Sequence, residues 1–414
     1  HITQRICGVC PVSHGTAAVK ALDHARGLVV GDNARLLRNL LGGADFLHSH
    51  ILHFYQLAAL DFIDGPAMAP WQPSLAADRR LDPTTTTTLV NHYVQALDIR
   101  RKAHELGAVF GGRMPAPPAI VPGGITAVPT AARISKARAL LTEIRSFVAN
   151  VYVPDVEALA AAYNDYDRIG AGPGNLLAFG VFDEGPQTLL LRAGRIAASG
   201  GGVQTVVLSA IGEDVAASYY SGSNNVNPAN GQTVPAYPKN GGYSWLKAPR
   251  YNGQPYETGA LARMTVNGDY GGGVSVMDRH RARALETVKI ADAMPRWLDG
   301  LDPTAPVYQP APIPNSGSGI GLTEAPRGAL GHWLRIADRR IANYQVLTPT
   351  CWNASPRDAA GGLGPIERAL VGTQVASLEE PVEVMRVIHS FDPCLSCAVH
   401  VSRPGREAVV RVMG

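Results

Sequence analysis

The chain has 414 residues, of which 46% are hydrophobic and 17% are charged, a balance typical of a globular protein with a large buried core. Its 37 basic and 34 acidic residues give a net charge of +3, and no lysine- and arginine-rich block forms a surface for nucleic acid. No stretch of about 18 apolar residues predicts a membrane-spanning helix, and no secretory signal is visible. These features argue against nucleic-acid-binding and membrane-spanning classes.

The first half of the chain is predicted to be mostly helical. Residues 34–63 carry apolar side chains at steps of three and four, which places them on one face of a long helix. Gly42 and Gly43 interrupt this pattern, at a cost that we expect the helix to tolerate. The threonines at 84–88 are expected to cap or link, and the same four-residue spacing continues from Leu89.

The remaining segments complete the fold prediction. Residues 137–153 and 279–298 are amphipathic and predict two more helices, whereas the β-branched residues of 201–211 predict a strand. Residues 219–245 and 305–321 are rich in turn-forming residues, but neither has the length and charge of a free linker. We therefore predict one large unit, mainly α with minor β (α+β), around a helix-bundle core.

The cysteines are concentrated at the two ends of the chain. Cys7 and Cys10 form one Cys-x-x-Cys pair, Cys394 and Cys397 form another, and Cys351 stands apart. An odd count in a chain of this size argues against a disulfide framework and favours a metal or redox role in a reducing environment. We expect Cys351 to be a small buried hydrophobe.

The two pairs could supply four thiolates to one centre, because two intervening residues let both sulfurs of a pair face the same point. A structural zinc site with four cysteine ligands is the simplest interpretation. Zinc sites usually draw their pairs from nearby segments, because a short loop costs less to close, whereas here almost the whole chain separates the pairs. Thiolates suit zinc, nickel and iron alike, so spacing alone leaves the metal open.

The residues around the pairs, "RICGVCPVSH" and "DPCLSCAVH", resemble the first and last signature motifs of the nickel–iron hydrogenase large subunit. Further matches lie between them in the family's order: "HILHFYQLAALDF", "FGGRMP" with "GGIT", "TEAPRGALGHW" and "PTCWNASPRD". The resemblance covers the length of the chain. It implies a hydrogenase large-subunit-like fold and the catalytic subunit of an uptake-type enzyme that oxidises dihydrogen.

The resemblance also implies the ligands of the metal centre. Cys7 and Cys394 would be terminal thiolates on nickel, and Cys10 and Cys397 would bridge nickel to an iron that carries cyanide and carbon monoxide. Dihydrogen would be cleaved heterolytically, with the metals as Lewis acids toward the hydride. Cys394 would be the first base, since a metal-bound thiolate is deprotonated and can accept the proton.

Three more positions match the family's surroundings of the centre, and a fourth departs from them. Arg327 corresponds to an arginine suspended over the active site, where it supplies a fixed positive charge and hydrogen-bond donors. Pro326 and Thr350 correspond to the wall around the diatomic ligands. Many relatives have an aspartate, paired with this arginine, where the present chain has Ser49. This difference removes a carboxylate partner from Arg327.

Histidines complete the implied site. His14, one helical turn after Cys10, would donate to a bridging sulfur and tune the metals. His400 would bind a magnesium ion together with the backbone carbonyl of Val346, and the carboxylate that completes that site would lie before His1. The spacing of the stripe His48, His50 and His53 favours packing and hydrogen bonds beneath the site over another metal site. 

Both ends of the chain carry expectations about processing. The chain begins without a methionine, and we expect further residues before His1. In the family an endopeptidase cuts after the last histidine once nickel is inserted. The resemblance therefore implies an unprocessed precursor in which residues 401–414, beginning at Val401, are a removable peptide. Nickel-insertion proteins and the endopeptidase would be partners.

Too few cysteines remain for an electron relay, so the resemblance implies a heterodimer with an iron–sulfur small subunit. The alternatives are a dihydrogen-sensing regulatory subunit, in which we expect no such tail, and a structural zinc protein. A related respiratory complex I subunit has lost the four cysteines, which are present here. "PVSH" resembles cytoplasmic relatives and predicts a cytoplasmic location, with membrane association only through partners.

Overall fold

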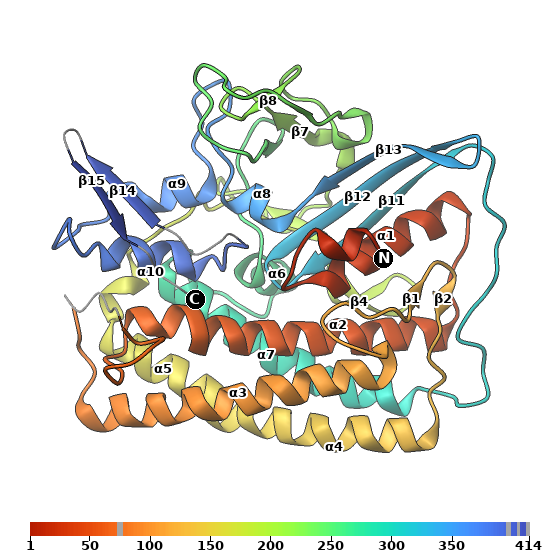
Figure 1. Cartoon of the computed structure of the whole chain (residues 1–414), viewed down its shortest axis with the longest axis horizontal. Helices are drawn as coiled ribbons and strands as arrows, with labels where there is room; N and C mark the ends of the chain where they lie inside the picture. The colour runs from red at the N-terminus through yellow and green to blue at the C-terminus, as the bar shows by residue number, and fades with distance from the viewer. Residues whose placement is uncertain (73–77, 395–398, 404–405, 411–414) are drawn as a thin grey trace.

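The structure, a computed structural model, describes residues 1–72, 78–394, 399–403 and 406–410, the last two ranges by their backbone only. Its four longest helices and one shorter helix lie together in one layer, with most of the strands and α1 on one side of it (Figure 1). This confirms the prediction of a mainly α fold with minor β around a helical core. The helices of the layer are α2 (Asp32–Leu52), α3 (Pro83–Gly111), α4 (Ala131–Phe147), α5 (Val153–Ala162) and α7 (Val276–Asp299).

Helix α2 lies at the centre of this layer, against α3 and α7. It confirms the helix predicted from residue 34 and continues after Leu52 as a π-helical turn, His53–Ala58, and a short 3₁₀ turn, Ala59–Asp61. Gly42 and Gly43 are tolerated because the side chains of Phe182 and Met294 occupy the space that a larger residue would fill. A Cβ on Gly43 would lie 2.8 Å from the sulfur of Met294 on α7.

The start of α3 differs from the prediction. Residues 84–88 are helical and do not cap or link. The cap is Asp82, whose carboxylate accepts hydrogen bonds from the backbone N–H groups of Thr84 and Thr85, with Pro83 at the first helical position. The predicted helices in 137–153 and 279–298 are confirmed by α4, α5 and α7.

A three-stranded antiparallel sheet covers α1 (Pro11–Ala25), and the sequence patterns did not predict it. Its strands are β11 (Gly317–Ala325), β12 (Gly328–Ala337) and β13 (Arg340–Leu347). Strand β11 passes so close to α1 that a Cβ on Gly319 or Gly321 would lie 1.9 Å from a helix carbonyl oxygen. Glycine at these two positions therefore brings the β11–β12 turn beside the first residues of α1.

The predicted strand at 201–211 is wrong. Gln204 makes only an isolated bridge to Arg195, and a 3₁₀ turn (Leu208–Ala210) precedes the strand that begins at Ile211. Val203 and Val207 are exposed, so their β-branched side chains do not mark a buried strand. The short strands in the middle of the chain are β3 (Leu176–Ala178), β4 (Val181–Gly185), β5 (Thr188–Leu191), β6 (Gly194–Ile196), β7 (Ile211–Asp214), β8 (Tyr220–Ser221), β9 (Val234–Pro235) and β10 (Ala248–Tyr251).

The remaining elements are short. One pair of strands, β1 (Ile120–Val121) and β2 (Gly124–Ile125), follows α3. The last part of the chain runs past the sheet toward the opposite end of the molecule, where β14 and β15 form a hairpin (Figure 1). Helix α6 (Ala260–Asn267) lies earlier in the chain, before α7. The elements of the last part are α8 (Pro349–Asn353), α9 (Pro365–Leu370), α10 (Val382–Ser390), β14 (Val399–Arg403) and β15 (Arg406–Val410).

Candidate metal centre

Three cysteine sulfurs from opposite ends of the chain meet at one point. Cys10 Sγ lies 2.8 Å from Cys7 Sγ, which in turn lies 3.1 Å from Cys394 Sγ. All three sulfurs lie within 4.8 Å of one another, and among the described residues they are the only group of cysteine, histidine or acidic side chains so arranged. The structure thus brings together three of the four predicted ligands. Cys397 lies outside the described residues.

The electrostatics of these thiols favour a cation between them. Hydrogen bonds from Cys10 and Cys394 hold the pKa of Cys7 at about 2, so this sulfur is a thiolate. The hydrogen bonds that Cys10 makes with Cys394 and Cys7, together with burial, raise its pKa well above the usual range. The contact with Cys10 lowers the pKa of Cys394, but Cys7 and burial outweigh it and raise this pKa to about 11. The three thiols can ionise together only if a positive charge compensates them.

The N-terminal pair is fixed by its own backbone. Cys10 occupies the N-cap position of α1, and Pro11 begins the helix. The backbone N–H groups of Val9 and Cys10 point at Cys7 Sγ, at 3.4 and 3.2 Å. Two residues between the cysteines thus fold into a turn that directs both sulfurs and two N–H dipoles to one side. This local arrangement adds to the stabilisation of the thiolate by Cys10 and Cys394.

Cys394 is held differently, by the helix before it. Helix α10 ends at Ser390, and the chain then passes through Asp392 to reach the cysteine. The backbone N–H of Cys394 donates to Thr350 Oγ1 at 3.0 Å. The position of Cys394 therefore depends on how α10 is seated in the rest of the molecule.

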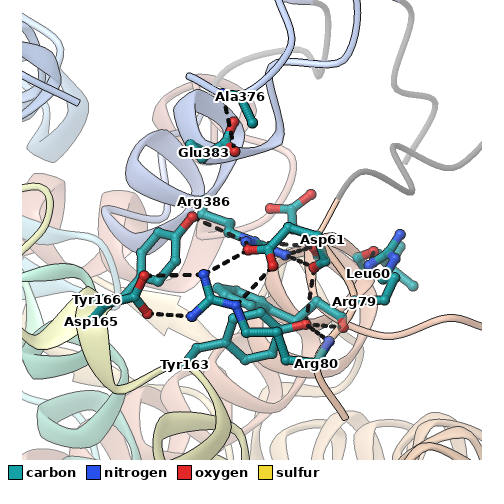
Figure 2. Close-up of polar contacts among 12 residues, drawn as sticks. Leu60, Asp61, Arg79, Arg80, Tyr163, Asp165, Tyr166, Ala376, Glu383 and Arg386 are labelled. Carbon is teal, nitrogen blue, oxygen red and sulfur yellow. Dashed lines mark hydrogen bonds and ion pairs between the residues drawn. The ribbon is translucent and has the colours of Figure 1, made fainter. Parts of the chain in front are cut away.

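Buried polar contacts, which we call the C-terminal seat, hold α10 in position (Figure 2). Arg386 of α10 is fully buried and donates to the carbonyl oxygens of Asp61 and Asp78, to the Asp78 carboxylate at 2.6 Å and to Tyr166 Oη at 3.0 Å. Its guanidinium also lies 4.5 Å from the ring centre of Phe62, a cation–π distance. One side chain thus ties α10 to the segments on both sides of residues 73–77.

The end of α10 has three further contacts. His389 Nδ1 donates to the Asp61 carboxylate at 2.6 Å, and His53 Nε2 donates to the carbonyl oxygen of His389 at 2.6 Å. Arg283 of α7 donates to the carbonyl oxygen of Ser390 at 2.9 Å. These contacts satisfy carbonyls that the end of a helix leaves without partners.

Arg327 lies at the tip of the β11–β12 turn and is 4% exposed, so it is not a surface arginine. Its Nη1 donates to Ser49 Oγ at 3.3 Å, and its Nη2 forms an ion pair of 2.9 Å with Asp392. Ser49 thus supplies no carboxylate, but Arg327 has another partner that was not predicted: Asp392, two residues before Cys394, balances the charge of the buried guanidinium.

The sulfurs and Arg327 line one cavity of about 90 Å³. His14 and Thr350 also line it, as predicted for neighbours of the centre, whereas Pro326 lies buried in the turn beside Arg327. His14 Nδ1 is 3.1 Å from His332 Nε2, and burial lowers the pKa of His14 to about 4. The other lining residues, which the sequence patterns did not single out, are Ile6, Leu246, Thr348 and Pro349.

The three-histidine stripe does not converge on a metal. His48 accepts from Arg100 Nε at 3.0 Å, His50 donates to the Glu286 carboxylate at 2.8 Å, and His53 contacts α10 as described above. The three rings thus have separate partners, as the spacing predicted. Cys351 is partly buried in a second apolar cluster and accepts a hydrogen bond from Thr348 Oγ1 at 3.1 Å.

The remaining predicted residues lie at the edge of what the structure describes. His400 and Val401 fall in β14, whose side chains are outside the described residues. Val346 in β13 pairs with His332 of β12. Asp392 is the functional residue that the sequence analysis missed, although it stands inside the quoted motif "DPCLSCAVH".

The site fits a thiophilic metal. Three soft sulfur ligands converge, the pKa values of two of them are raised so that a bound cation would favour their ionisation, and a buried guanidinium faces the same cavity. Such a ligand set suits nickel, iron or zinc rather than magnesium or calcium. A fixed arginine beside the sulfurs adds a group that a purely structural zinc site does not need.

Comparison with known proteins assigns the chain to a family. The model of the nickel-dependent hydrogenase family matches residues 1–80, 65–274 and 272–400. The periplasmic [NiFeSe] hydrogenase large subunit of Desulfomicrobium baculatum is 42% identical over 99% of this chain and 87% of its own length. The uptake hydrogenase large subunit of Bradyrhizobium diazoefficiens is 30% identical over 99% of this chain and 88% of its own length.

Solved structures agree with the sequence matches. The H2-activated [NiFeSe] hydrogenase of D. baculatum superposes with a TM-score of 0.92 and 41% identity, covering 95% of this chain and 88% of that one. The likeness to these relatives therefore extends from the sequence to the fold. This chain belongs to the nickel-dependent hydrogenase family and is a hydrogenase large subunit, an oxidoreductase that acts on dihydrogen.

Proposed function

We propose that this subunit oxidises dihydrogen at a nickel–iron centre held by Cys7, Cys10, Cys394 and Cys397, and passes the electrons to an iron–sulfur small subunit. The convergence of three of these sulfurs from opposite ends of the chain is the observation that carries the proposal. Large-subunit relatives imply a small-subunit partner, and the heterodimer with an iron–sulfur chain is its expected form. When bound, the centre supplies the Lewis acidity that polarises dihydrogen and accepts its electrons.

Cys394 and Arg327 have different roles in the proposed reaction. Cys394 is the first base, because its half-buried sulfur lines the cavity and a metal-bound thiolate is deprotonated and can accept the proton. Arg327 faces the same cavity as a permanent cation, since burial would lower its pKa but Asp392 and the cysteine sulfurs outweigh burial and raise it. A fixed positive charge in a water-poor cavity stabilises negative charge that develops there.

The surroundings of the centre have tuning roles in this proposal. Cyanide and carbon monoxide would complete the iron ligands, with Pro326 and Thr350 in the wall around them and Ser49 beside Arg327. His14 lines the cavity and would donate to a bridging sulfur. His400 and the Val346 carbonyl would hold a magnesium ion near the end of the processed chain.

Residues 401–414 act as the removable maturation peptide. The family match ends at residue 400, which agrees with cleavage between His400 and Val401. In the full chain, β14, which includes His400 and Val401, pairs with β15. Nickel-insertion proteins would act before the endopeptidase, and deletion of 401–414 should bypass the need for that protease. Intact mass of active enzyme from a nickel-replete host tests this step, and a retained tail would refute it.

None of the described helices has the length and apolar character required to cross a membrane. The motif "PVSH" favours a cytoplasmic location with membrane association through partners, whereas the D. baculatum relative is named as periplasmic. We keep the cytoplasmic location as the prediction. Fractionation of cells that produce the native complex, with an antibody against this subunit, tests it.

The function is tested on the mature complex of this subunit with its small subunit. We expect dihydrogen-dependent reduction of a viologen dye, one nickel and one iron per large subunit, and infrared bands of cyanide and carbon monoxide. Asp392→Asn should keep the metals but lower turnover by about 10- to 100-fold, because Arg327 loses its ion-pair partner. A complex that binds nickel and iron but only responds to dihydrogen without turnover would support the sensing alternative.

A further inference from the structure

Arg263 of α6 makes an unusually complete set of buried contacts. Its side chain is 0% exposed. Nε and Nη2 donate to the two carboxylate oxygens of Glu286 at 2.6 and 2.7 Å, and Nη1 donates to Glu324 at 2.8 Å. The two remaining N–H groups donate to the carbonyl oxygens of Ala325 and Pro326, at 2.9 and 2.8 Å. All five donors of the guanidinium are therefore used.

The two carbonyls belong to the residues directly before Arg327. They form the start of the β11–β12 turn, which closes at the pair Ala325 and Gly328. Gly328 has a φ of +135°, and a Cβ there would lie 2.3 Å from Thr258 Oγ1. The backbone on both sides of Arg327 is thus restrained, on one side by Arg263 and on the other by a glycine in a crowded left-handed position.

Arg263 also acts on the other wall of the Arg327 pocket. Glu286, which it holds with two hydrogen bonds, accepts a hydrogen bond from His50 Nε2 at 2.8 Å. His50 follows Ser49 on α2, and Ser49 accepts a hydrogen bond from Arg327. One guanidinium therefore holds the turn that carries Arg327 and, through Glu286 and His50, the helix that Arg327 contacts.

Stability alone is a weak reason for such a network. Burial would raise the pKa of Glu286, but Arg263 and His50 outweigh burial and hold it at about 2, whereas burial raises the pKa of Glu324 to about 7. Desolvating these charges costs much of what their attraction returns, and apolar residues of the same shape often stabilise a core equally well. A network of this kind is better explained by the geometry that it imposes.

We propose that Arg263 is a positioning residue that sets the direction of the Arg327 guanidinium over the metal cavity. It acts through the carbonyls of Ala325 and Pro326 and through the Glu286–His50 contact. This proposal rests on the proposed role of Arg327 in turnover. Arg263 itself does not line the cavity.

A kinetic double-mutant cycle tests the proposal in the mature complex. We expect Arg327→Lys to lower kcat for dihydrogen oxidation by about 100-fold, and Arg263→Met to lower it by about 10-fold or more with little change in KM. If Arg263 acts through Arg327, the double variant should be no slower than Arg327→Lys alone, within about threefold. Losses that multiply in the double variant would overturn the proposal.

Two readouts that do not depend on turnover accompany the cycle. The nickel content of Arg263→Met should equal that of the wild type, and a crystal structure of the variant complex should show Arg327 moved away from Asp392. An unmoved Arg327 would overturn the proposal. If Arg263→Met does not assemble, Glu286→Gln, which keeps the size of the side chain, takes its place in the same cycle.

The matched control is Arg38→Met. Arg38 is also a buried arginine that binds one carboxylate, Asp23, and donates to two backbone carbonyls, those of Val121 and Gly124. It makes none of its hydrogen bonds with the Arg327 turn, so its loss should leave kcat and the position of Arg327 unchanged. If Arg327→Lys itself keeps full turnover, the role of Arg327 fails, and the crystal structure alone decides the positioning claim.

Discussion

The two ends of the chain bring sulfur to the same cavity in different ways. At the N-terminal end, Cys7 and Cys10 lie in a turn that begins α1, and backbone N–H groups hold Cys7 Sγ. At the C-terminal end, Cys394 follows α10, which side-chain ion pairs and hydrogen bonds hold from several distant segments. The first seat is local and the second is assembled only when the rest of the chain has folded.

The two ends of the chain should differ in how sensitive the site geometry is to substitution. A backbone turn keeps its geometry as long as α1 is formed, whereas a seat built on Arg386 and Asp61 can be weakened by one side-chain change. It also fits a chain in which the last ligands enter the site late, as the proposed maturation requires. Variants at the two ends should therefore differ in their effects on metal binding and on stability.

Removal of a sulfur should have the largest effect. Cys10→Ser and Cys394→Ser each replace a soft thiolate by a hydroxyl that does not ionise at neutral pH, so both should lose nickel and turnover. Metal analysis of the purified complex checks this expectation. Cys351→Ser is the control, because Cys351 is not among the converging sulfurs. If Cys394→Ser kept the wild-type nickel content, the two-ended site would be wrong.

Arg386→Met should weaken only the C-terminal seat. It leaves the Asp61 carbonyl without its buried donor and removes one donor from Asp78, whose carboxylate stays paired with Arg80, so the free energy of unfolding should fall by about 2 kcal/mol. Nickel retention should fall while α1 remains protected in hydrogen exchange. Arg145→Met is the matched control: its ion pair with Asp292 is exposed, and its loss should cost at most about 0.5 kcal/mol. Equal effects of the two variants would contradict the seat.

Thr350→Val should loosen Cys394 without unseating α10. The variant removes the acceptor of the Cys394 backbone N–H, so nickel affinity should fall by about 10-fold. Competition with a chelator measures the affinity, and the unfolding temperature reports on the fold. Thr142→Val, which removes an exposed helix hydroxyl, provides the reference. A loss of stability without a loss of nickel affinity would show that Thr350 serves packing only.

The smallest effect is a pH dependence of the C-terminal seat. Burial would lower the pKa of His389, but the charge of Asp61 and its hydrogen bond outweigh burial and raise it above the unfolded value near 6.5. The resulting stabilisation is fully present below that value and is lost as pH rises through the raised pKa. Asp61→Asn should therefore lower the unfolding temperature more at pH 6 than at pH 9. A gap that widens toward high pH would contradict this pairing.

The sequence predicted those features that local patterns determine. The three- and four-residue steps in 34–63 and 279–298 predicted the buried faces of α2 and α7, because helical periodicity is a property of the segment itself. The cysteine pairs with their flanking residues predicted the meeting of Cys7, Cys10 and Cys394 through a family resemblance. Spacing alone could not have distinguished zinc from nickel and iron.

What the sequence did not reveal depends on contacts between distant segments. The β11–β12–β13 sheet was missed because glycines and buried polar residues, such as Glu324 and His332, hide its alternation. The partner of Arg327 was sought at position 49, where the local motif placed it, but the fold provides Asp392 from near the other end of the chain. No local signal could show that Arg263 and Arg386 are buried cations.

The central claim is that sulfurs from both ends of the chain hold a nickel–iron pair, and X-ray absorption of the mature complex tests it most directly. The account predicts a nickel edge whose fine structure shows sulfur neighbours and an iron atom, in stoichiometric amounts, with both lost in Cys10→Ser. A single zinc atom surrounded by sulfur, with no nickel or iron, would contradict it.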